Sequence, residues 1–399
     1  MRKLRLAISI LAVVGVLGVT HGCYPVTGER AYCEISRLDP ALPVERSKDV
    51  PMMRIGSLPH PFGPIPVNYA DPERLGAHQY RTSAFRSVRL GETSAGIIYT
   101  RQVGFIDLAH TRNAADLTWF SYQRILSAML ASRPRVLLAG AEPTIFILHL
   151  DYPAGWHALD EPGRERMAER FAVVLAVRMG YVISTWHEVL TTFGFHGVPG
   201  IPEQQSAFMY DDQPSHRVGA VAAGRAILQV QSVGAGYEEA MTEALADTVA
   251  GLGPLDQSGS RRAVVACRGV WWAVDGPTAR QVHLGMVGER FEPMLIHLDY
   301  PAVLGESGDI SPLPDNLSPR VWVVPSLAGL ASRAPAMAPM IPTARIEIDP
   351  LVSYSDEIFQ AAGLDAPWID LDRDGPKLKQ YLIERLAGIE TAGDAGGGR

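Results

Sequence analysis

Hydrophobic residues recur at helical spacing in the central part of the chain. An apolar residue returns every three or four positions over Phe105–Ala131, Gly163–Phe193 and Tyr237–Gly251, so we predict a helix in each stretch. Within the second stretch, Phe171–Ile183 is apolar on nearly every side, which indicates a helix that is buried against several neighbours. A fourth helix is expected over Ser215–Gln229, because its first residue can cap a helix N-terminus.

Shorter apolar runs predict strands on both sides of these helices, and the C-terminal part adds two short helices. The predicted strands are Ser94–Val103, Val136–Ala139, Thr144–Leu150, Ala263–Val274, Arg280–Met286, Met294–Leu298, Arg320–Val324 and Ala344–Ile348. The predicted short helices are Asp356–Gly363 and Lys377–Ala387.

Helices in the middle and strands toward the end favour an α+β fold over a regularly alternating one. We therefore expect a single large domain, with central helices packed on a mixed or antiparallel sheet. The core domain is placed at residues 91–325, a C-terminal extension at 326–390 and a disordered, glycine-rich tail at 391–399.

Residues 23–90 are rich in proline, with nine prolines between Tyr24 and Leu75. Such a segment cannot sustain long helices or central strands. Two interpretations stay open. The segment is either an extended stalk, or an ordered arm that wraps the domain and is pinned by Met52, Met53, Ile55 and Phe62.

The first 22 residues have the three parts of a bacterial export signal. Basic residues within Arg2–Arg5 precede the apolar run Leu6–Val19, which is too short for a stable membrane span, and small residues then lead into Cys23. Cys23 stands where a lipoprotein signal places its acylated cysteine, which predicts a lipid anchor. The alternative is cleavage by ordinary signal peptidase, which leaves Cys23 free for a disulfide.

Composition narrows the class of protein without indicating an activity. Hydrophobic residues make up 47% of the chain and charged residues 20%, as in a globular protein with a core. The net charge of −7 and the lack of a Lys/Arg cluster argue against a nucleic-acid partner. The three cysteines allow a Cys33–Cys267 bridge if Cys23 carries lipid, a Cys23–Cys33 bridge, or a free and buried Cys267.

One six-residue segment occurs twice. His149–Ala154 (HLDYPA) returns unchanged as His297–Ala302, and each copy closes an apolar strand. The simpler interpretation is two strands that end alike in one sheet, each stopped by its proline. The alternative is a pair of His/Asp strand ends that flank one cleft.

Two helices carry the side chains most suited to catalysis. Asp107 and His110 are three residues apart and share a helix face, while His187 and Glu188 lie near the end of another helix. The latter pair resembles the start of a zinc-protease helix, but Thr191 replaces the second histidine, which excludes that class.

If the two helices pack together, these four side chains form a metal site or an acid/base pair, which Glu203, Tyr210, Asp211 and Asp212 on a nearby loop could join. The alternative is structural. The histidines are then hydrogen-bonded core residues, and the acids cap helices or pair with Arg112 and Arg101.

A second candidate metal site lies near the C-terminus. Asp370, Asp372 and Asp374, followed by Gly375, match the opening of a calcium loop. The twelfth loop position is Tyr381 instead of a bidentate glutamate, so an acidic turn before a helix is the alternative. Zinc and calcium are thus the two cofactors to consider.

Three segments together resemble a bacterial domain-of-unknown-function family of exported proteins, many of them predicted lipoproteins. They are GFIDLAHTRNAADLTWF (Gly104–Phe120), WHEVLTTFGF (Trp186–Phe195) and SAFMYDD (Ser206–Asp212), within a similarity that extends over about Ile98–Pro325. The resemblance implies no activity. It implies a recurring polar set, Asp107, His110, His187, Glu188 and Asp211.

Two functional hypotheses follow. Both describe an exported, lipid-anchored protein of the bacterial envelope without an assigned activity, in contact with the membrane through its anchor and with envelope components. The first is a non-catalytic binding or assembly protein, whose polar motifs are structural networks. The second is a hydrolase or transferase that acts on an envelope substrate. In that case one carboxylate or imidazole of the polar set activates water, and the others hold a divalent metal or orient the base.

Overall fold

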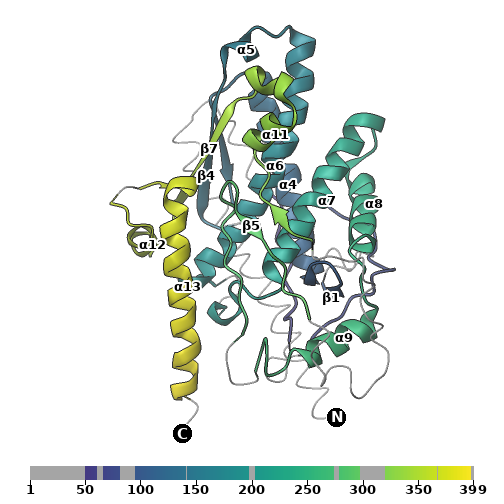
Figure 1. Ribbon diagram of the computed structural model, residues 1–399, viewed down its shortest axis with the longest axis vertical. Coiled ribbons are helices and arrows are strands. Elements are labelled where there is room, and N and C mark those ends of the chain that lie inside the picture. Colours follow the sequence, from purple (N-terminus) through teal and green to yellow (C-terminus); the bar gives the residue numbers. More distant parts are fainter. Residues whose placement is uncertain are drawn as a thin grey trace, which may run out of the picture.

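A computed structural model describes residues 50–60, 66–80, 95–140, 142–196, 203–273, 278–296, 320–365 and 367–396. Four long helices form its centre: α4 (Leu108–Leu130), α6 (Glu161–Thr192), α7 (Asp212–Val233) and α8 (Tyr237–Ala250) (Figure 1). Helices and small antiparallel sheets share one α+β domain, which confirms the predicted fold class. Among the described residues, no helix is long and apolar enough to cross a membrane.

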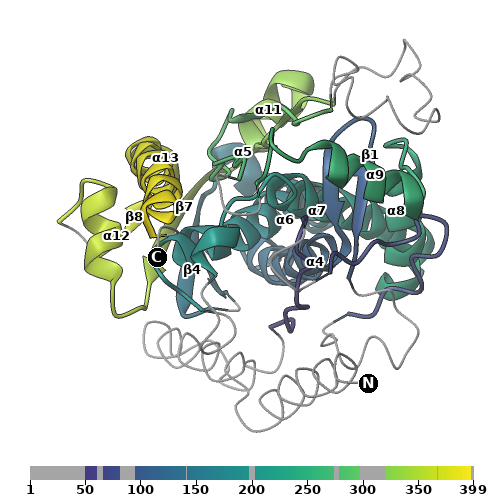
Figure 2. The same cartoon turned by 90° about the horizontal axis from the view of Figure 1, so that it is seen from below.

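The main sheet has four antiparallel strands in the order β3-β4-β7-β8. These are β3 (Arg135–Ala139), β4 (Thr144–Asp151), β7 (Thr343–Pro350) and β8 (Ile369–Asp370). The two central strands pair along their whole length, from Thr144 opposite Pro350 to Asp151 opposite Thr343. In Figure 2 this sheet lies beside the central helices, with the C-terminal helices at its outer side. Buried residues of β3, β4 and β7 join those of α4 and α6 in the main core.

Two two-stranded sheets and the remaining helices complete the described chain. One sheet pairs β1 (Ile97–Thr100) with β2 (Gly104–Asp107), and the other pairs β5 (Arg290–Phe291) with β6 (Trp322–Val323). The remaining helices are α5 (Ala154–His157), α9 (Gln257–Ala266), α11 (Leu327–Arg333), α12 (Ser355–Ala361), α13 (Leu371–Gly396) and the 3₁₀ turns η2 (Gln204–Ser206) and η3 (Pro335–Met340).

Glycines allow the central helices to approach one another closely. A Cβ at Gly180 of α6 would overlap the side chain of Thr118 on α4. A Cβ at Gly219 of α7 would overlap the backbone oxygen of Thr111, also on α4. At these two points α4 therefore contacts the bare backbone of both neighbours, which places their polar side chains within reach of one another.

Among the central helices, α4 and α7 begin at residues that differ from the prediction. The first residues of the predicted helix 105–131 belong to β2, and α4 begins after Asp107, whose Oδ1 accepts a hydrogen bond from the backbone N–H of Ala109 (3.3 Å). Helix α7 begins three residues before Ser215, so this serine does not cap it. The hydroxyl of Ser215 donates instead to the backbone carbonyl of Asp211.

Three predicted strands are wrong within the described residues. The described part of Ala263–Val274, which ends at Ala273, is the end of α9 and a following turn, because Asp256 caps the helix through the N–H of Gly259 and the apolar run continues past the helix end. Arg280–Met286 has a single bridge, at Arg280, and Met294–Ile296 has no strand. The predicted Ser94–Val103 and Arg320–Val324 shorten to β1 and β6.

Residues 50–60 lie across the start of α4 and are held there by polar contacts. Arg54 is 3% exposed, and its guanidinium forms a buried salt bridge with Asp116 (2.9 Å). Its backbone exchanges two hydrogen bonds with the side chain of Asn113. Met52 and Ile55, which the sequence suggested as apolar pins, are 43% and 54% exposed. Met53 packs partly against the core, and Phe62 lies outside the described residues.

We predict that Gly219→Ala destabilises the domain by about 1–3 kcal/mol, because the added methyl group forces α7 away from α4. Gly236→Ala is the matched control, since nothing lies within 4 Å of a Cβ at Gly236. Urea unfolding of both variants and the wild type measures the difference. Equal unfolding midpoints for the two variants would mean that the close helix contact does not matter for stability.

Candidate metal centre

The site begins where β2 ends and α4 starts. Asp107 is fully buried, and burial raises the pKa of its carboxyl group. Its Oδ2 accepts a hydrogen bond from the backbone N–H of Ser57 (3.1 Å), and its own N–H donates to Ser215 Oγ (2.7 Å). One helical turn later, His110 Nε2 lies 4.0 Å from the same Oδ2. The junction thus holds a carboxylate and an imidazole together.

The start of α7 brings two more carboxylates to this point. Asp211 directly precedes α7, and Asp212 is its first residue. Asp212 Oδ1 lies 3.1 Å from His110 Nδ1. His216, one turn into α7, has its ring centroid 5.5 Å from that of His110. Helices α4 and α7 therefore present two acids and two histidines to each other.

Several polar atoms of this cluster are buried without a partner. They are both carboxylate oxygens of Asp211, Oδ2 of Asp212 and Nδ1 of His216, and the described part of the chain gives none of them a hydrogen bond. These three residues are at most 3% exposed. Burial and the charge of Asp212 raise the pKa of Asp211 well above its ordinary value. Buried carboxylates in proteins are normally hydrogen-bonded, ion-paired or bound to metal.

The geometry suits a metal ion. One ligand atom each from His110, Asp211 and Asp212 can be chosen so that all three lie within 4.8 Å of one another. Ligands bound to one ion at about 2.0–2.2 Å lie roughly 3–4.5 Å apart. The contact between His110 Nδ1 and Asp212 Oδ1 has this separation but not the direction of a hydrogen bond. Imidazole and carboxylate are ligands that zinc accepts.

Helix α6 adds a fourth acid, Glu188. Its Oε2 accepts a hydrogen bond from the backbone N–H of Phe208 (3.1 Å). Burial and the charge of Asp212 raise the pKa of Glu188 to about 8, although His187 and His110 act in the opposite direction. A carboxyl group with this pKa can both hold and release a proton near neutral pH.

His187 has a different partner. Its Nδ1 lies 2.9 Å from Glu142 Oε1, at the turn between β3 and β4. Burial would lower the pKa of His187, but the bond to Glu142 raises it to about 9. Burial and the positive charges of His110 and His187 in turn lower the pKa of His216 well below its ordinary value. A neutral His216 adds no positive charge to the cluster.

The segment 54–60 forms one wall of the site. A Cβ at Gly56 would overlap His110 Nε2, so only glycine permits this close approach. Further along, the hydroxyl of Tyr210 donates to the carbonyl of Pro59 (3.0 Å). The side chains of His110 and His187 remain about 20% exposed, and they are the partly open members of an otherwise buried cluster.

The profile of a protein family of unknown function (DUF4056) matches residues 50–281, more than half of the chain. The chain belongs to the DUF4056 family. Comparison with curated proteins and with solved structures gave no significant match. The DUF4056 region begins at the wall segment and includes every residue of the cluster, whereas β7, β8 and α13 lie beyond it.

Within the DUF4056 region, the structure brings together most of the polar set that the sequence suggested. Asp107, His110, Glu188, Asp211 and Asp212 share one cluster, as their contacts and mutual electrostatic effects show. His187 is turned to Glu142, and Tyr210 is turned to the wall segment. The charge of Glu203 acts on His187. Arg112 bonds to His78 and to the carbonyl of Leu75 instead of pairing with these acids.

Three features of the site were not predicted from the sequence. They are His216, the hydrogen bonds by which Ser215 joins Asp107 to Asp211, and the close contact of Gly56 with His110. His216 lies four residues after Asp212, a spacing that puts both on one helix face. The expectation that α7 starts at Ser215 concealed this spacing. No local pattern indicates Gly56, because its role depends on contact with a helix more than fifty residues away.

The three acids of the suggested calcium loop do not converge. Asp372 Oδ1 accepts from Arg178 (2.6 Å) and from the N–H of Val287 (2.8 Å). Asp370 accepts from two backbone N–H groups at the start of α13, and Asp374 is bound by Arg373. Protein donors thus occupy these carboxylates, which act as caps and ion pairs. Their helix begins at Leu371, before the expected Lys377.

The cysteines and the repeated six-residue segment lie only partly within the described residues. Cys267 is a free, buried thiol, and Cys23 and Cys33 lie outside the described residues. The first copy of the repeated segment ends β4, where His149 Nε2 lies 2.7 Å from Glu347 Oε2. The second copy, His297–Ala302, lies outside the described residues, so a shared cleft remains a prediction.

We predict that Glu188 makes the metal-free protein less stable as the pH rises from about 6.5 to 8. Its folded pKa of about 8 lies above its ordinary value of 4.5, so in this range the folded state binds more protons than the unfolded state. Glu188→Gln should flatten the decline by up to about 1.4 kcal/mol per pH unit.

Urea unfolding in EDTA at several pH values measures this slope. Glu161→Gln is the control, because Glu161 is an exposed residue in the first turn of the same helix. Parallel slopes for Glu188→Gln and the wild type would show that Glu188 has no raised pKa.

Proposed function

We propose that this protein is a hydrolase that uses a divalent cation, zinc or a similar ion, bound by His110, Asp211 and Asp212. The observation that carries the proposal is the burial of three carboxylate oxygens of Asp211 and Asp212 without a hydrogen-bond partner among the described residues. Because an unpaired buried carboxylate is costly, a cation that all three ligands contact accounts for their arrangement.

The charges of the cluster support the same conclusion. Burial would lower the pKa of His110, but the contact with Asp212 and the charge of Asp107 raise it well above its ordinary value. One imidazolium would therefore face four acids, which include Asp211 and Glu188. A divalent cation would stabilise the charged form of more of these acids than one imidazolium does.

The ligand set favours a catalytic ion over a structural one. Structural zinc sites are closed by four protein ligands, whereas catalytic sites have three and keep a position for water. Here the face of the cluster at His110 stays partly open. A zinc ion held there would lower the pKa of a bound water to about 7. Glu188, which holds a proton near neutral pH, is suited to general acid/base work beside it.

We also propose that the protein is exported by a bacterium and held at the membrane by a lipid on Cys23. The support is the basic start, the short apolar run Leu6–Val19 and the small residue before the cysteine. An envelope component is then the substrate class, because the anchored domain would meet it directly.

For the metal, we expect the purified full chain to bind one Zn²⁺ after treatment with chelator and dialysis. Asp211→Asn removes a ligand charge without changing size, and should weaken binding more than about 100-fold, since even outer-shell changes cost about 10–100-fold. Asp374→Asn is the control and should bind as the wild type does. Calorimetry measures both. Unchanged affinity in Asp211→Asn would contradict the proposed centre.

For the reaction, we expect the zinc-loaded protein to release soluble products from isolated bacterial envelopes. Glu188→Gln should retain zinc but lower the rate about 10²–10⁴-fold, the usual contribution of a general acid or base. Mass spectrometry of the supernatant measures the release. A zinc-loaded wild type that releases nothing beyond the Glu188→Gln level would refute hydrolysis.

For the anchor, we expect metabolic labelling with a fatty-acid analogue in a bacterial host to label the wild type and not Cys23→Ser. Cys33→Ser is the matched control and should keep the label. Mass spectrometry of the mature N-terminus provides the second measurement. An N-terminus without lipid on Cys23 would exclude the anchor.

A further inference from the structure

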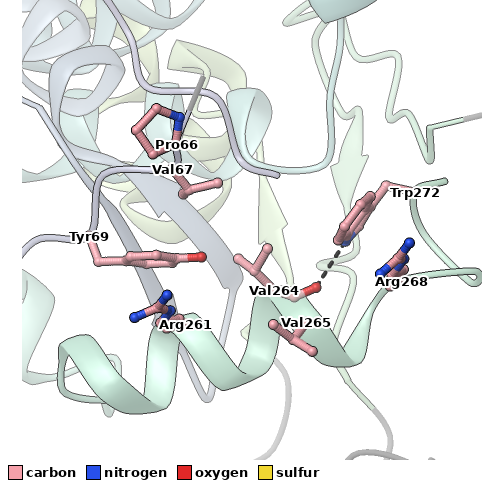
Figure 3. Close-up of a pocket in the computed structure, with 8 residues that line it drawn as sticks. All are labelled: Pro66, Val67, Tyr69, Arg261, Val264, Val265, Arg268 and Trp272. Carbon is pink, nitrogen blue, oxygen red and sulfur yellow. Dashed lines mark hydrogen bonds between the residues drawn. The ribbon is translucent and has the colours of Figure 1, made fainter. Parts of the chain in front are cut away.

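A cavity that shares no residue with the acidic cluster lies between α9 and residues 66–69. Its volume is about 410 Å³, within the range of about 300–1,000 Å³ that is usual for small-molecule sites. Figure 3 shows the eight residues that line it: Pro66, Val67, Tyr69, Arg261, Val264, Val265, Arg268 and Trp272. This lining contains apolar and aromatic groups and two arginines, but no acid.

The apolar wall is held rigidly. Trp272 donates from Nε1 to the carbonyl of Val264 (2.9 Å), and its ring stacks on His60 with centroids 5.0 Å apart. On the other side, the carbonyl of Tyr69 accepts a hydrogen bond from Gln257 (2.9 Å). The cavity therefore does not need to rearrange its wall to take a ligand, which lowers the entropic cost of binding.

The two arginines occupy different ends of the cavity. Arg261 lies beside Tyr69, and Arg268 lies beside Trp272, with its guanidinium 5.9 Å from the indole ring (Figure 3). Within the described chain neither arginine forms a salt bridge. By contrast, Arg262 on the same helix donates to Ser258 and does not line the cavity. The Arg261 end thus combines an available guanidinium with a phenol hydroxyl.

We propose that this cavity binds an anionic amphiphile, an acyl chain that ends in a carboxylate or a phosphate. Arg261 and the hydroxyl of Tyr69 hold the head group, and the chain lies along Val264, Val265 and Trp272. A guanidinium binds carboxylate and phosphate oxygens through charge-assisted hydrogen bonds. The apolar wall adds affinity that an inorganic anion cannot gain. The site does not depend on the metal centre proposed above.

Calorimetry of the full chain with dodecyl phosphate, below its micelle concentration, tests the proposal. Dodecyltrimethylammonium keeps the chain and reverses the charge, while inorganic phosphate keeps the head group and lacks the chain. We expect the first ligand to bind at least tenfold more tightly than either control. Equal binding of either control would overturn the proposal.

Single substitutions in and beside the cavity test where the head group of the ligand binds. Arg261→Ala should weaken dodecyl phosphate binding at least tenfold, whereas Arg262→Ala, which removes the same charge from the same helix, should leave it unchanged. Val265→Asp places a carboxylate in the wall at a residue that is 63% exposed, and should abolish binding without unfolding the helix. Equal effects of Arg261→Ala and Arg262→Ala would contradict the assigned site.

Vesicles distinguish the source of the ligand. If the ligand is a membrane lipid, phosphatidylglycerol vesicles should displace dodecyl phosphate and phosphatidylcholine vesicles should not. If the ligand is a free amphiphile, neither vesicle displaces it, and dodecyl phosphate still binds in an Arg261-dependent way. Displacement by both vesicles alike would show that charge does not direct binding, against the proposal.

Discussion

The close approach of α4 to α6 and α7 is the constraint on which the site depends. Gly180 and Gly219 remove the side chains that would otherwise separate these helices. A side chain at either position would overlap α4 and force the helices apart. Because glycine avoids this overlap, Asp107 and His110 meet the acids at the start of α7. Backbone geometry thus sets the distances between side chains that lie about a hundred residues apart in sequence.

That closeness has an electrostatic cost. Buried acids from three helices repel one another, and burial together with mutual repulsion raises the pKa values of Asp211 and Glu188. Ion pairs at the edge, such as His187 with Glu142, relieve only part of this repulsion. The salt bridge between Arg54 and Asp116 holds the wall segment over the cluster, which keeps bulk water from solvating the acids. The proposed cation would offset this repulsion, because a positive charge beside the acids favours their ionised form.

The spacing of apolar residues along the chain predicted the helices and strands that form from local sequence. Five elements begin and end within two residues of their predicted bounds: helices α6 and α8 and strands β3, β4 and β7. The spacing of Asp107 and His110 indicated a shared face correctly. Helix α9 was mistaken for a strand because its buried residues merge with the apolar turn after it. Long-range contacts, such as Gly56 on His110, leave no periodic trace.

X-ray diffraction at the zinc absorption edge, from crystals of the zinc-loaded full chain, tests the central claim most directly. We expect one strong anomalous peak about 2.0–2.2 Å from the ligand atoms of His110, Asp211 and Asp212. A map without a peak at this position, or with its peak at Asp370, Asp372 and Asp374 instead, would contradict it.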